Sequence, residues 1–254
     1  MQNYLRQIAV VVTIVITLAV NGLANALPIN GQNTGQISDR FQVYFVPAGY
    51  VFAIWGVIYL GLIAFAVFQA LPAQRENPRL QATGWWIALG GLANSIWIFL
   101  WHYEAFALTV VVMLGLLATL IVTYLRLGIG RTAVPAAETW AVRVPFSIYL
   151  GWITVATVAN ITSLLDDVNW DGFGLAPEIW MGLVLAAVVG IATAMAFTRR
   201  DVAYALVLLW ALAGISVKHA AVAAVAMPTW VAFGLVALTL AAAFLVRRRT
   251  LAAV

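Results

Sequence analysis

The sequence predicts an all-α integral membrane protein with about eight transmembrane helices. Of its 254 residues, 65% are apolar and 9% are charged, and its mean hydropathy is +1.01. Soluble domains carry about half apolar and about a quarter charged residues, so this chain lacks the charge to cover a soluble surface. The composition excludes an ordinary cytosolic enzyme, a nucleic-acid binder and a disordered chain. The apolar runs are continuous, which argues against a strand barrel.

Eight apolar stretches account for the predicted spans. Each is close to the ~20 residues that a helix needs to cross a hydrocarbon core about 30 Å thick. Only Lys218 and His219 interrupt the run that contains the last two stretches. The predicted spans are residues 7–27, 47–71, 84–101, 105–126, 143–165, 178–198, 202–218 and 222–246.

Local signals support the starts of several spans. Pro47 and Pro145 lie near the starts of the second and fifth spans, where a missing N–H costs a helix nothing.

The first span also fits a second interpretation. Arg6, the apolar run after it and the small residues at 24–26 resemble a cleavable signal peptide, and this alternative stays open.

The basic residues predict the orientation. With eight spans and a cytoplasmic N-terminus, all of the 13 Lys and Arg residues except Arg40 and Lys218 lie on the cytoplasmic side. Positive charge is retained on that side during insertion. Seven spans would instead place Arg247, Arg248 and Arg249 outside. We therefore expect a multi-pass protein of the bacterial cytoplasmic membrane with both termini in the cytoplasm.

Large aromatic side chains gather on the second, third and fifth spans. Phe52, Trp55 and Tyr59 are spaced three and four residues apart, so they share one helix face. Such a face packs inside the bundle or lines a flat apolar cavity. Other rings lie at span ends and fit an aromatic belt at the lipid headgroups. These belt rings are Trp85, Trp86, Trp101 and Tyr103.

Two asparagines lie within predicted spans, Asn94 in the third and Asn160 in the fifth. Their amides need partners in a low-dielectric region. They either form interhelical hydrogen bonds, each worth about 1 kcal/mol, or bind the polar edge of a ligand. The outside loop 29–46 is long for a helix connection, and such loops are often functional lids.

Three motifs resemble those of the TspO/MBR family, the tryptophan-rich sensory proteins and translocator proteins. Residues 47–59, Pro-Ala-Gly-Tyr-Val-Phe-Ala-Ile-Trp-Gly-Val-Ile-Tyr, resemble that family's second helix. Asn94-Ser-Ile-Trp97 is similar to its third helix, and residues 145–160 to its fifth. The resemblance covers residues 1–165 and implies a five-helix membrane domain with a ligand cavity under the first loop. Residues 166–254 then form an extension of about three transmembrane helices.

The resemblance implies a membrane receptor, sensor or carrier. The family's ligands are tetrapyrroles such as protoporphyrin and haem, and sterols in its eukaryotic members. A planar macrocycle would stack on aromatic rings, with an Asn or Tyr group fixing its edge. A transporter of small hydrophobic molecules and a scaffold without a ligand stay open, as does a homodimer. The expected ligand-binding residues are Phe52, Trp55, Tyr59, Asn94, Trp97, Tyr149, Trp152 and Asn160.

The sequence offers no recognisable catalytic or metal-binding set. His102 and His219 pair with no carboxylate at a catalytic spacing, and we expect His102 and Glu104 to be solvated in a short turn. The chain has no cysteine, so it has no thiolate nucleophile or ligand. We therefore expect no enzyme, no metal and no required cofactor, with a tetrapyrrole as the expected ligand.

Two further patterns have alternative interpretations. Lys218 lies where a retinal Schiff base would, but that cation needs a carboxylate within the membrane, and all Asp and Glu are predicted in loops or at span ends. Residues 167–178 match the EF-hand loop pattern D-x-N-x-D-G-x5-E. Acidic loops rich in turn residues match this pattern easily, so calcium binding stays open.

Overall fold

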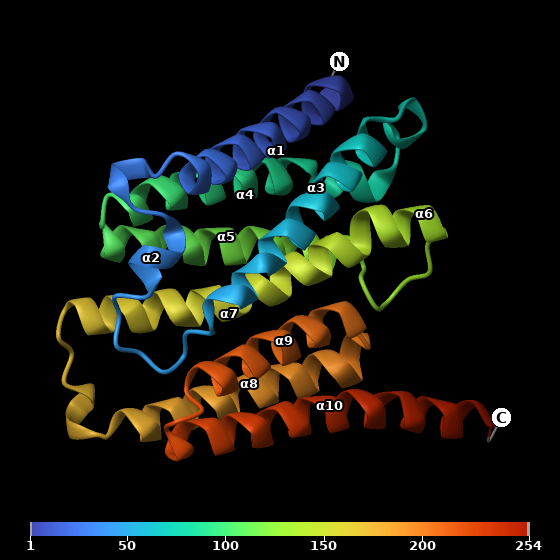
Figure 1. Ribbon diagram of the computed structural model, residues 1–254. Helices are drawn as coiled ribbons and strands as arrows, with labels where there is room; N and C mark the ends of the chain where they lie inside the picture. The colour runs from blue at the N-terminus through green and yellow to red at the C-terminus, as the bar shows by residue number, and fades with distance from the viewer. Residues whose placement is uncertain (1, 253–254) are drawn as a thin grey trace.

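The protein is built from helices. The computed structural model describes residues 2–252, and these form helices and turns without a strand. Successive long helices run in opposite directions, and α1 begins at the end of the molecule where α10 ends (Figure 1). The long helices are α1 (Gln2–Ala26), α3 (Ile54–Ala70), α4 (Pro78–His102), α5 (Phe106–Arg126), α7 (Val144–Asp167), α8 (Pro177–Arg199), α9 (Val202–Lys218) and α10 (Ala223–Ala252).

Short helical segments lead into two of the long helices. A 3-10 turn, η2 (Gly49–Ala53), precedes α3, and α6 (Ala136–Glu138) with a π-helical turn, η4 (Thr139–Arg143), precedes α7. Pro145 has no N–H to donate to the preceding turn, which favours this irregularity. The remaining single turns lie in the connections: η1 (Ile29–Gly31), α2 (Thr34–Ser38), η3 (Pro72–Gln74) and η5 (Gly172–Gly174).

The helices agree with the predicted spans. Within the described residues, seven helical segments are long and apolar enough to cross a membrane, and they coincide with the first six predicted spans and the last one. The seventh predicted span coincides with α9, which is apolar but shorter, at 17 residues. The chain is therefore an integral, multi-pass membrane protein of the all-α class.

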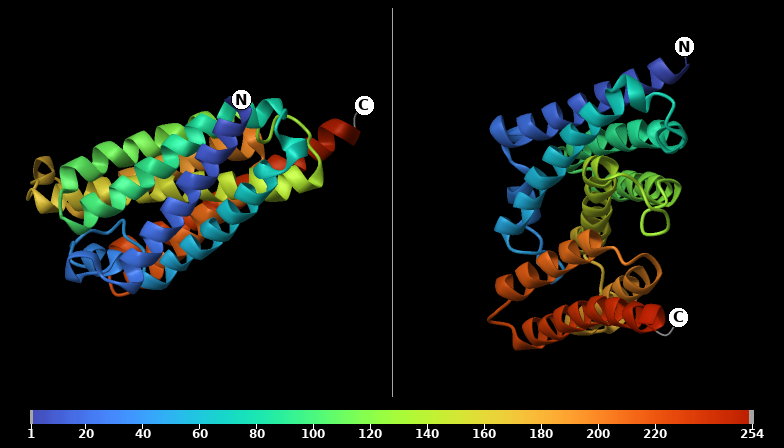
Figure 2. Two further views of the ribbon diagram at one scale, coloured as in Figure 1. Left: turned by 90° about the horizontal axis from the view of Figure 1, so that it is seen from above. Right: turned by 90° about the vertical axis from the view of Figure 1, so that its right-hand side faces the viewer.

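Helix α7 lies between two groups of helices. On one side of it are α1, α3, α4 and α5, which together with α7 we call the N-terminal bundle; on the other side is the C-terminal group, α8, α9 and α10 (Figures 1 and 2). The two regions meet where α9 packs on α7. Gly151 permits this approach, because a Cβ there would lie 3.1 Å from Cβ of Val207 and 3.2 Å from the carbonyl oxygen of Tyr204.

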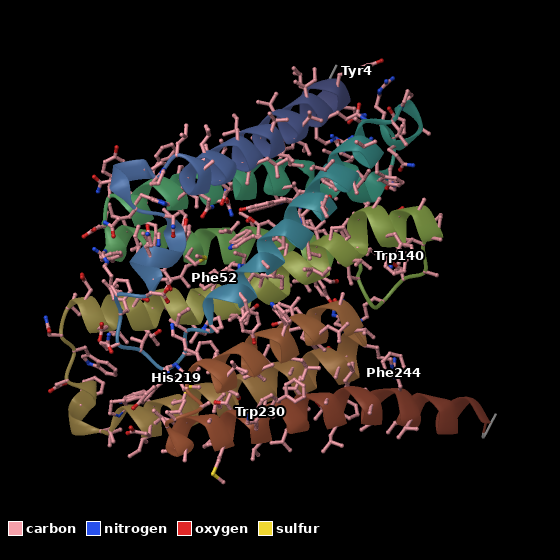
Figure 3. The ribbon with its side chains drawn as sticks, viewed as in Figure 1. Tyr4, Phe52, Trp140, His219, Trp230 and Phe244 are labelled. Carbon is pink, nitrogen blue, oxygen red and sulfur yellow. The ribbon has the colours of Figure 1, made fainter. Side chains whose placement is uncertain are left out.

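The two ends of the molecule differ in charge. Most of the arginines lie at the end where α1 begins, which we call the basic end, whereas Arg40 and Lys218 lie at the opposite, loop end. Figure 3 shows Tyr4 and Trp140 at the basic end and His219 at the loop end. This distribution follows the predicted one; the side chains of residues 247–249 lie outside the part that the structure describes.

The acidic residues lie at helix ends and in connections, but two of them are buried. Glu138 accepts hydrogen bonds from Nε (2.6 Å) and Nη2 (2.8 Å) of Arg79. Asp201 precedes α9 and is 8% exposed. Both lie in connections or at helix ends, where the sequence placed every Asp and Glu, and their side-chain partners come from other helices.

Candidate ligand site

The outer loop, residues 29–46, folds across the loop end of the N-terminal bundle. Its short helix α2 is capped by Asn33, whose side chain accepts from the Gln36 amide while the Gln36 side chain accepts from the Asn33 amide. Further along, the Phe41 ring packs against Phe106, with ring centroids 5.1 Å apart. Arg40 forms an ion pair of 2.9 Å with Glu104 in the turn between α4 and α5. The loop is thereby held over the bundle.

Beneath this loop, the predicted aromatic residues of α3 and α7 contact one another. Trp55 and Tyr59 stack with centroids 5.6 Å apart, as their spacing predicts. The Trp55 ring also meets Tyr149 at 6.0 Å and Trp152 at 6.2 Å. Phe52, in η2, meets Trp152 edge-on at 5.6 Å. These separations are those of favourable ring pairs, so the rings form one continuous cluster.

Asn94 joins three helices. Its Oδ1 accepts from Nδ2 of Asn21 on α1 at 2.7 Å, and its Nδ2 donates to the hydroxyl of Tyr149 on α7 at 2.9 Å. All three residues are buried. The amide is thus satisfied by other helices, which is the interhelical alternative that the sequence left open.

Asn160 has the same role on α7. Its Oδ1 accepts from Nε1 of Trp97 at 2.9 Å, and its Nδ2 donates to Oγ1 of Thr109 on α5 at 2.8 Å. The Trp97 ring is fixed in turn by Trp101, which stacks on it with centroids 5.2 Å apart. The rings on α4 are therefore held in defined orientations beside α7.

A cavity of about 50 Å³ lies between the outer loop and these rings. Its wall includes Phe52, Trp97, Trp152 and Asn160 from the predicted set. Trp152 is 2% exposed, and its Nε1 has no hydrogen-bond partner. Oγ1 of Thr34, which also lines the cavity from the outer loop, is likewise buried and without a partner. A buried N–H without an acceptor is rare in proteins and costs stability.

The structure brings all eight predicted residues into this one region, by ring contacts, by the Asn94 and Asn160 hydrogen bonds or by shared lining of the cavity. Sequence reasoning missed four neighbours. Trp101 has a recoverable signal, since it follows Trp97 by four residues and so shares its helix face. The others come from helices and a loop whose orientation the sequence does not reveal. The missed residues are Asn21, Thr34, Trp101 and Thr109.

Two expectations about the end of α4 are wrong. Trp101 is not in an aromatic belt: it is 4% exposed, and its Nε1 donates to the carbonyl oxygen of Thr34 at 3.2 Å. His102 is not solvated but fully buried, with Nδ1 2.8 Å from the carbonyl oxygen of Ile98. Both errors have one cause, because the outer loop folds back over this helix end. Glu104 does face solvent, and the hydrogen bond from Arg40 lowers its pKa.

The residues of the EF-hand-like loop and Lys218 form contacts within the protein. In the 167–178 loop, Asp171 accepts from the Phe173 amide at 3.0 Å, and Glu178 accepts from the Tyr44 hydroxyl at 2.9 Å. Among the described residues, no three His, Cys, Asp or Glu side chains gather as a metal site would require. Lys218 pairs with Asp39 of the outer loop at 3.3 Å, at the loop end and away from the membrane interior.

The fold and the cavity define a class: an all-α, multi-pass membrane protein with aromatic clusters packed beneath an outer loop. The family model described as "TSPO-like protein" matches residues 7–245, and the chain belongs to this family. The matched range includes most of the C-terminal group as well as the N-terminal bundle. Comparisons with curated proteins and with solved structures gave no match.

Proposed function

We propose that this protein is a receptor, sensor or carrier that binds a flat hydrophobic ligand, such as a porphyrin, haem or a sterol-like molecule, beneath the outer loop. One observation carries this proposal: the unpaired Nε1 of Trp152, which is buried beside a ring-lined cavity. A carbonyl, carboxylate or hydroxyl oxygen on the ligand would accept this hydrogen bond. This donor is unpaired in the unliganded protein, so the hydrogen bond to the ligand would add to the free energy of binding.

The rings supply the apolar part of the proposed site. Phe52, Trp97, Trp101 and Trp152 all line the cavity. Ring pairs with centroids 5–6 Å apart, such as Trp97 with Trp101 at 5.2 Å, are stable through offset or edge contacts. A planar ligand that enters between the loop and the rings would make contacts of the same kind. Shape and ring faces, rather than ion pairs, would then hold it.

Ligand binding requires the cavity to widen. About 50 Å³ holds a few water molecules, whereas small-molecule sites measure about 300–1,000 Å³. The outer loop and the residues just after it form one wall, through Thr34, Ser38 and Pro47. Since the other walls are packed helices, we propose that this wall moves. The loop is then a lid, and its opening is part of binding.

We further infer that α9 crosses the membrane with the other seven helical segments and that both termini are cytoplasmic. Its 17 residues reach the lower end of the ~17–25 that span a bilayer. The chain has no cysteine, so single-cysteine variants report sidedness without background. Arg131→Cys should react with an impermeant maleimide only after the cells are permeabilised. Asn169→Cys should already react in intact cells. The reverse pattern would reject this orientation.

The binding site is tested by titrating protoporphyrin and following the shift of its absorption band. Trp152→Phe keeps a ring and removes the indole N–H, so we expect about tenfold weaker binding. Trp85→Phe is the matched control, because Trp85 is 57% exposed and does not line the cavity. Equal affinity of wild type and Trp152→Phe would reject the proposed hydrogen bond.

Sensing and carriage differ in whether the ligand crosses the membrane. Proteoliposomes loaded with the same porphyrin separate them: release faster than from protein-free vesicles would favour a transporter, and binding without release a receptor. The residues that line the proposed site come from one chain. A homodimer is therefore not needed for the site and stays a prediction.

A further inference from the structure

A second cavity of about 260 Å³ lies at the loop end. It is bounded by the outer loop, the end of α7, the η5 connection and the start of α8. Figure 1 shows these segments side by side at the end where α7 passes into α8. None of its lining residues lines the cavity beneath Trp152. It is therefore a separate site, and it is larger than the first.

Its wall includes four aromatic side chains: Tyr44, Phe45, Trp170 and Trp180. Trp170 and Trp180 have centroids 5.0 Å apart with planes inclined by 57°. Nε1 of Trp180 donates to the carbonyl oxygen of Gly172 at 2.9 Å, which fixes that indole. Tyr44, from the outer loop, is held by its hydroxyl hydrogen bond of 2.9 Å to Glu178. The rings are thus fixed before a ligand arrives, and their faces carry negative potential.

The cavity wall also carries negative charge without a matching positive one. Asp166 and Asp171 line it, and no Lys, Arg or His does. Asp166 accepts from the Gln42 amide at 3.2 Å, and Asp171 accepts from the Phe173 amide at 3.0 Å. Both donors are neutral backbone groups, so neither carboxylate is neutralised. Neither takes part in an ion pair within the described side chains.

The basic side chains at this end are engaged elsewhere. Arg40 pairs with Glu104, and Lys218 pairs with Asp39. His219 packs edge-on against Tyr44 with ring centroids 5.4 Å apart. Burial and the nearby Lys218 lower the pKa of His219, so at neutral pH this ring adds no positive charge next to the cavity.

We propose that this cavity binds an organic ammonium ion that carries an aromatic or short apolar group. Aromatic faces and carboxylates together favour such a cation, and Leu165, Met181 and Val184 supply an apolar wall for its hydrocarbon part. A bare metal ion is disfavoured, since the described residues contain no group of three ligands for one. An anionic tetrapyrrole is repelled by the two carboxylates. This ligand class therefore differs in charge from that of the cavity beneath Trp152.

The test uses benzyltrimethylammonium as the probe and neopentylbenzene, its uncharged carbon isostere, as the comparison. Binding is measured by isothermal titration calorimetry on the full chain in phosphatidylcholine nanodiscs, with empty nanodiscs as the baseline. In the double variant Asp166→Asn with Asp171→Asn, the amide oxygens still accept the backbone hydrogen bonds while both charges are removed. Trp170→Leu removes one ring of the cavity wall and keeps an apolar side chain at this position. Asp167→Asn is the matched control, since Asp167 is exposed and adjacent but does not line the cavity.

We expect one saturable site for the cation and none for the isostere. The double variant and Trp170→Leu should each bind the cation about tenfold more weakly, while Asp167→Asn binds it like the wild type. Equal binding of the uncharged isostere, or equal weakening by Asp167→Asn, would overturn the proposal. If the double variant fails to fold, Asp171→Asn alone decides the question, because this side chain is exposed. Protoporphyrin titration should be unchanged in all these variants, so failure here leaves the first site untouched.

Discussion

The N-terminal bundle and the C-terminal group are held together by different interactions. The bundle buries polar side chains and bonds them between helices, as in the chain from Asn21 through Asn94 to Tyr149. In α8–α10 the buried side chains are mainly aliphatic, and the buried Thr229 bonds only within its own helix, to the carbonyl oxygen of Val225. Hydrogen bonds between helices fix relative positions in a way that aliphatic packing in lipid does not. This difference supports the proposal that the site beneath Trp152 lies in the bundle and that the C-terminal group supports it.

The supporting role is visible at the loop end. The Ala48 amide donates to the carbonyl oxygen of Gly214 on α9 at 3.2 Å, and Nε1 of Trp210 donates to that of Val51 at 3.0 Å. Gly214 has no side chain here because a Cβ would lie 2.1 Å from Cγ2 of Val51. The segment that follows the outer loop therefore rests on α9. The C-terminal group thus contacts the segment next to the proposed lid.

The largest effect is expected where a buried carboxylate joins the two regions. Asp201 accepts from the hydroxyls of Tyr124 (2.8 Å) and Ser147 (2.6 Å) and from the Tyr204 amide (3.0 Å). Asp201→Ala removes all three hydrogen bonds and leaves buried donors unpaired, so we expect a loss of about 3 kcal/mol in the free energy of unfolding. Titration with sodium dodecyl sulfate, followed by circular dichroism, measures it.

The control for this prediction is Asp167→Ala, which removes an exposed carboxylate and should change the free energy of unfolding by less than about 0.5 kcal/mol. A similarly small change for Asp201→Ala would mean that the remaining contacts hold α9 on α7, including the hydrogen bond of 3.2 Å from the Tyr204 hydroxyl to Oγ1 of Thr154.

A smaller loss is expected within the bundle. Asn94→Leu breaks the hydrogen bonds to Asn21 and Tyr149 and should cost about 1–2 kcal/mol in the same unfolding measurement. Tyr149→Phe removes only the second of these bonds and should cost about half as much. If the two variants were equally unstable, the bond between α1 and α4 would contribute nothing, and the bundle would resemble the C-terminal group in what holds it together.

The sequence predicts the helices well because a bilayer requires long apolar runs, and these are visible without knowing any contact. It also predicts that Trp55 and Tyr59 lie on one face, since helical spacing alone decides that. It does not predict that Asn21 meets Asn94, because this depends on how two helices are rotated relative to each other. The buried position of Asp201 is hidden for the same reason: its partners come from α5 and α7.

The structure of the loop end is the part of the molecule that the sequence predicts least well. Trp101 and His102 lie at the end of a span, where exposure to headgroups is the usual outcome, yet the outer loop buries both. Likewise, the carboxylates of 167–178 match a calcium pattern locally but are separated by the turn at η5. The burial and contacts of these residues depend on how the connections fold over distant helices, and the periodicity of the sequence carries no information about that.

The contact between the C-terminal group and the lid should depend on pH. His219 packs on Tyr44, and burial followed by the charge of Lys218 lowers its pKa below 6.5. As the pH falls, the unfolded chain takes up this proton before the folded chain does. The contribution of His219 to the free energy of unfolding is therefore fully present above pH 6.5 and is lost as the pH drops towards the folded pKa. Because the ring is half-buried, we expect less than about 1 kcal/mol. Unfolding measured at pH 7.5 and pH 5.0 tests it.

His219→Gln is the control for the pH effect, since it removes the titrating ring. Glu178 and Lys218 face the same contact, and both remain in this variant. An unchanged difference between the two pH values in His219→Gln would assign the effect to another group.

The smallest effects on global stability are expected at the two ion pairs that flank the lid. Arg40–Glu104 ties the outer loop to the N-terminal bundle at 2.9 Å, and Lys218–Asp39 ties it to α9 at 3.3 Å. Exposed pairs of this kind contribute about 0–1 kcal/mol, so Glu104→Gln or Lys218→Gln should leave the unfolding curve nearly unchanged. Hydrogen exchange of the amides of residues 36–42 should nevertheless become faster in each variant, because local opening needs less free energy than unfolding. If only Glu104→Gln accelerated exchange, the C-terminal group would not support the lid through this pair, and the contacts of Gly214 and Trp210 would carry that role.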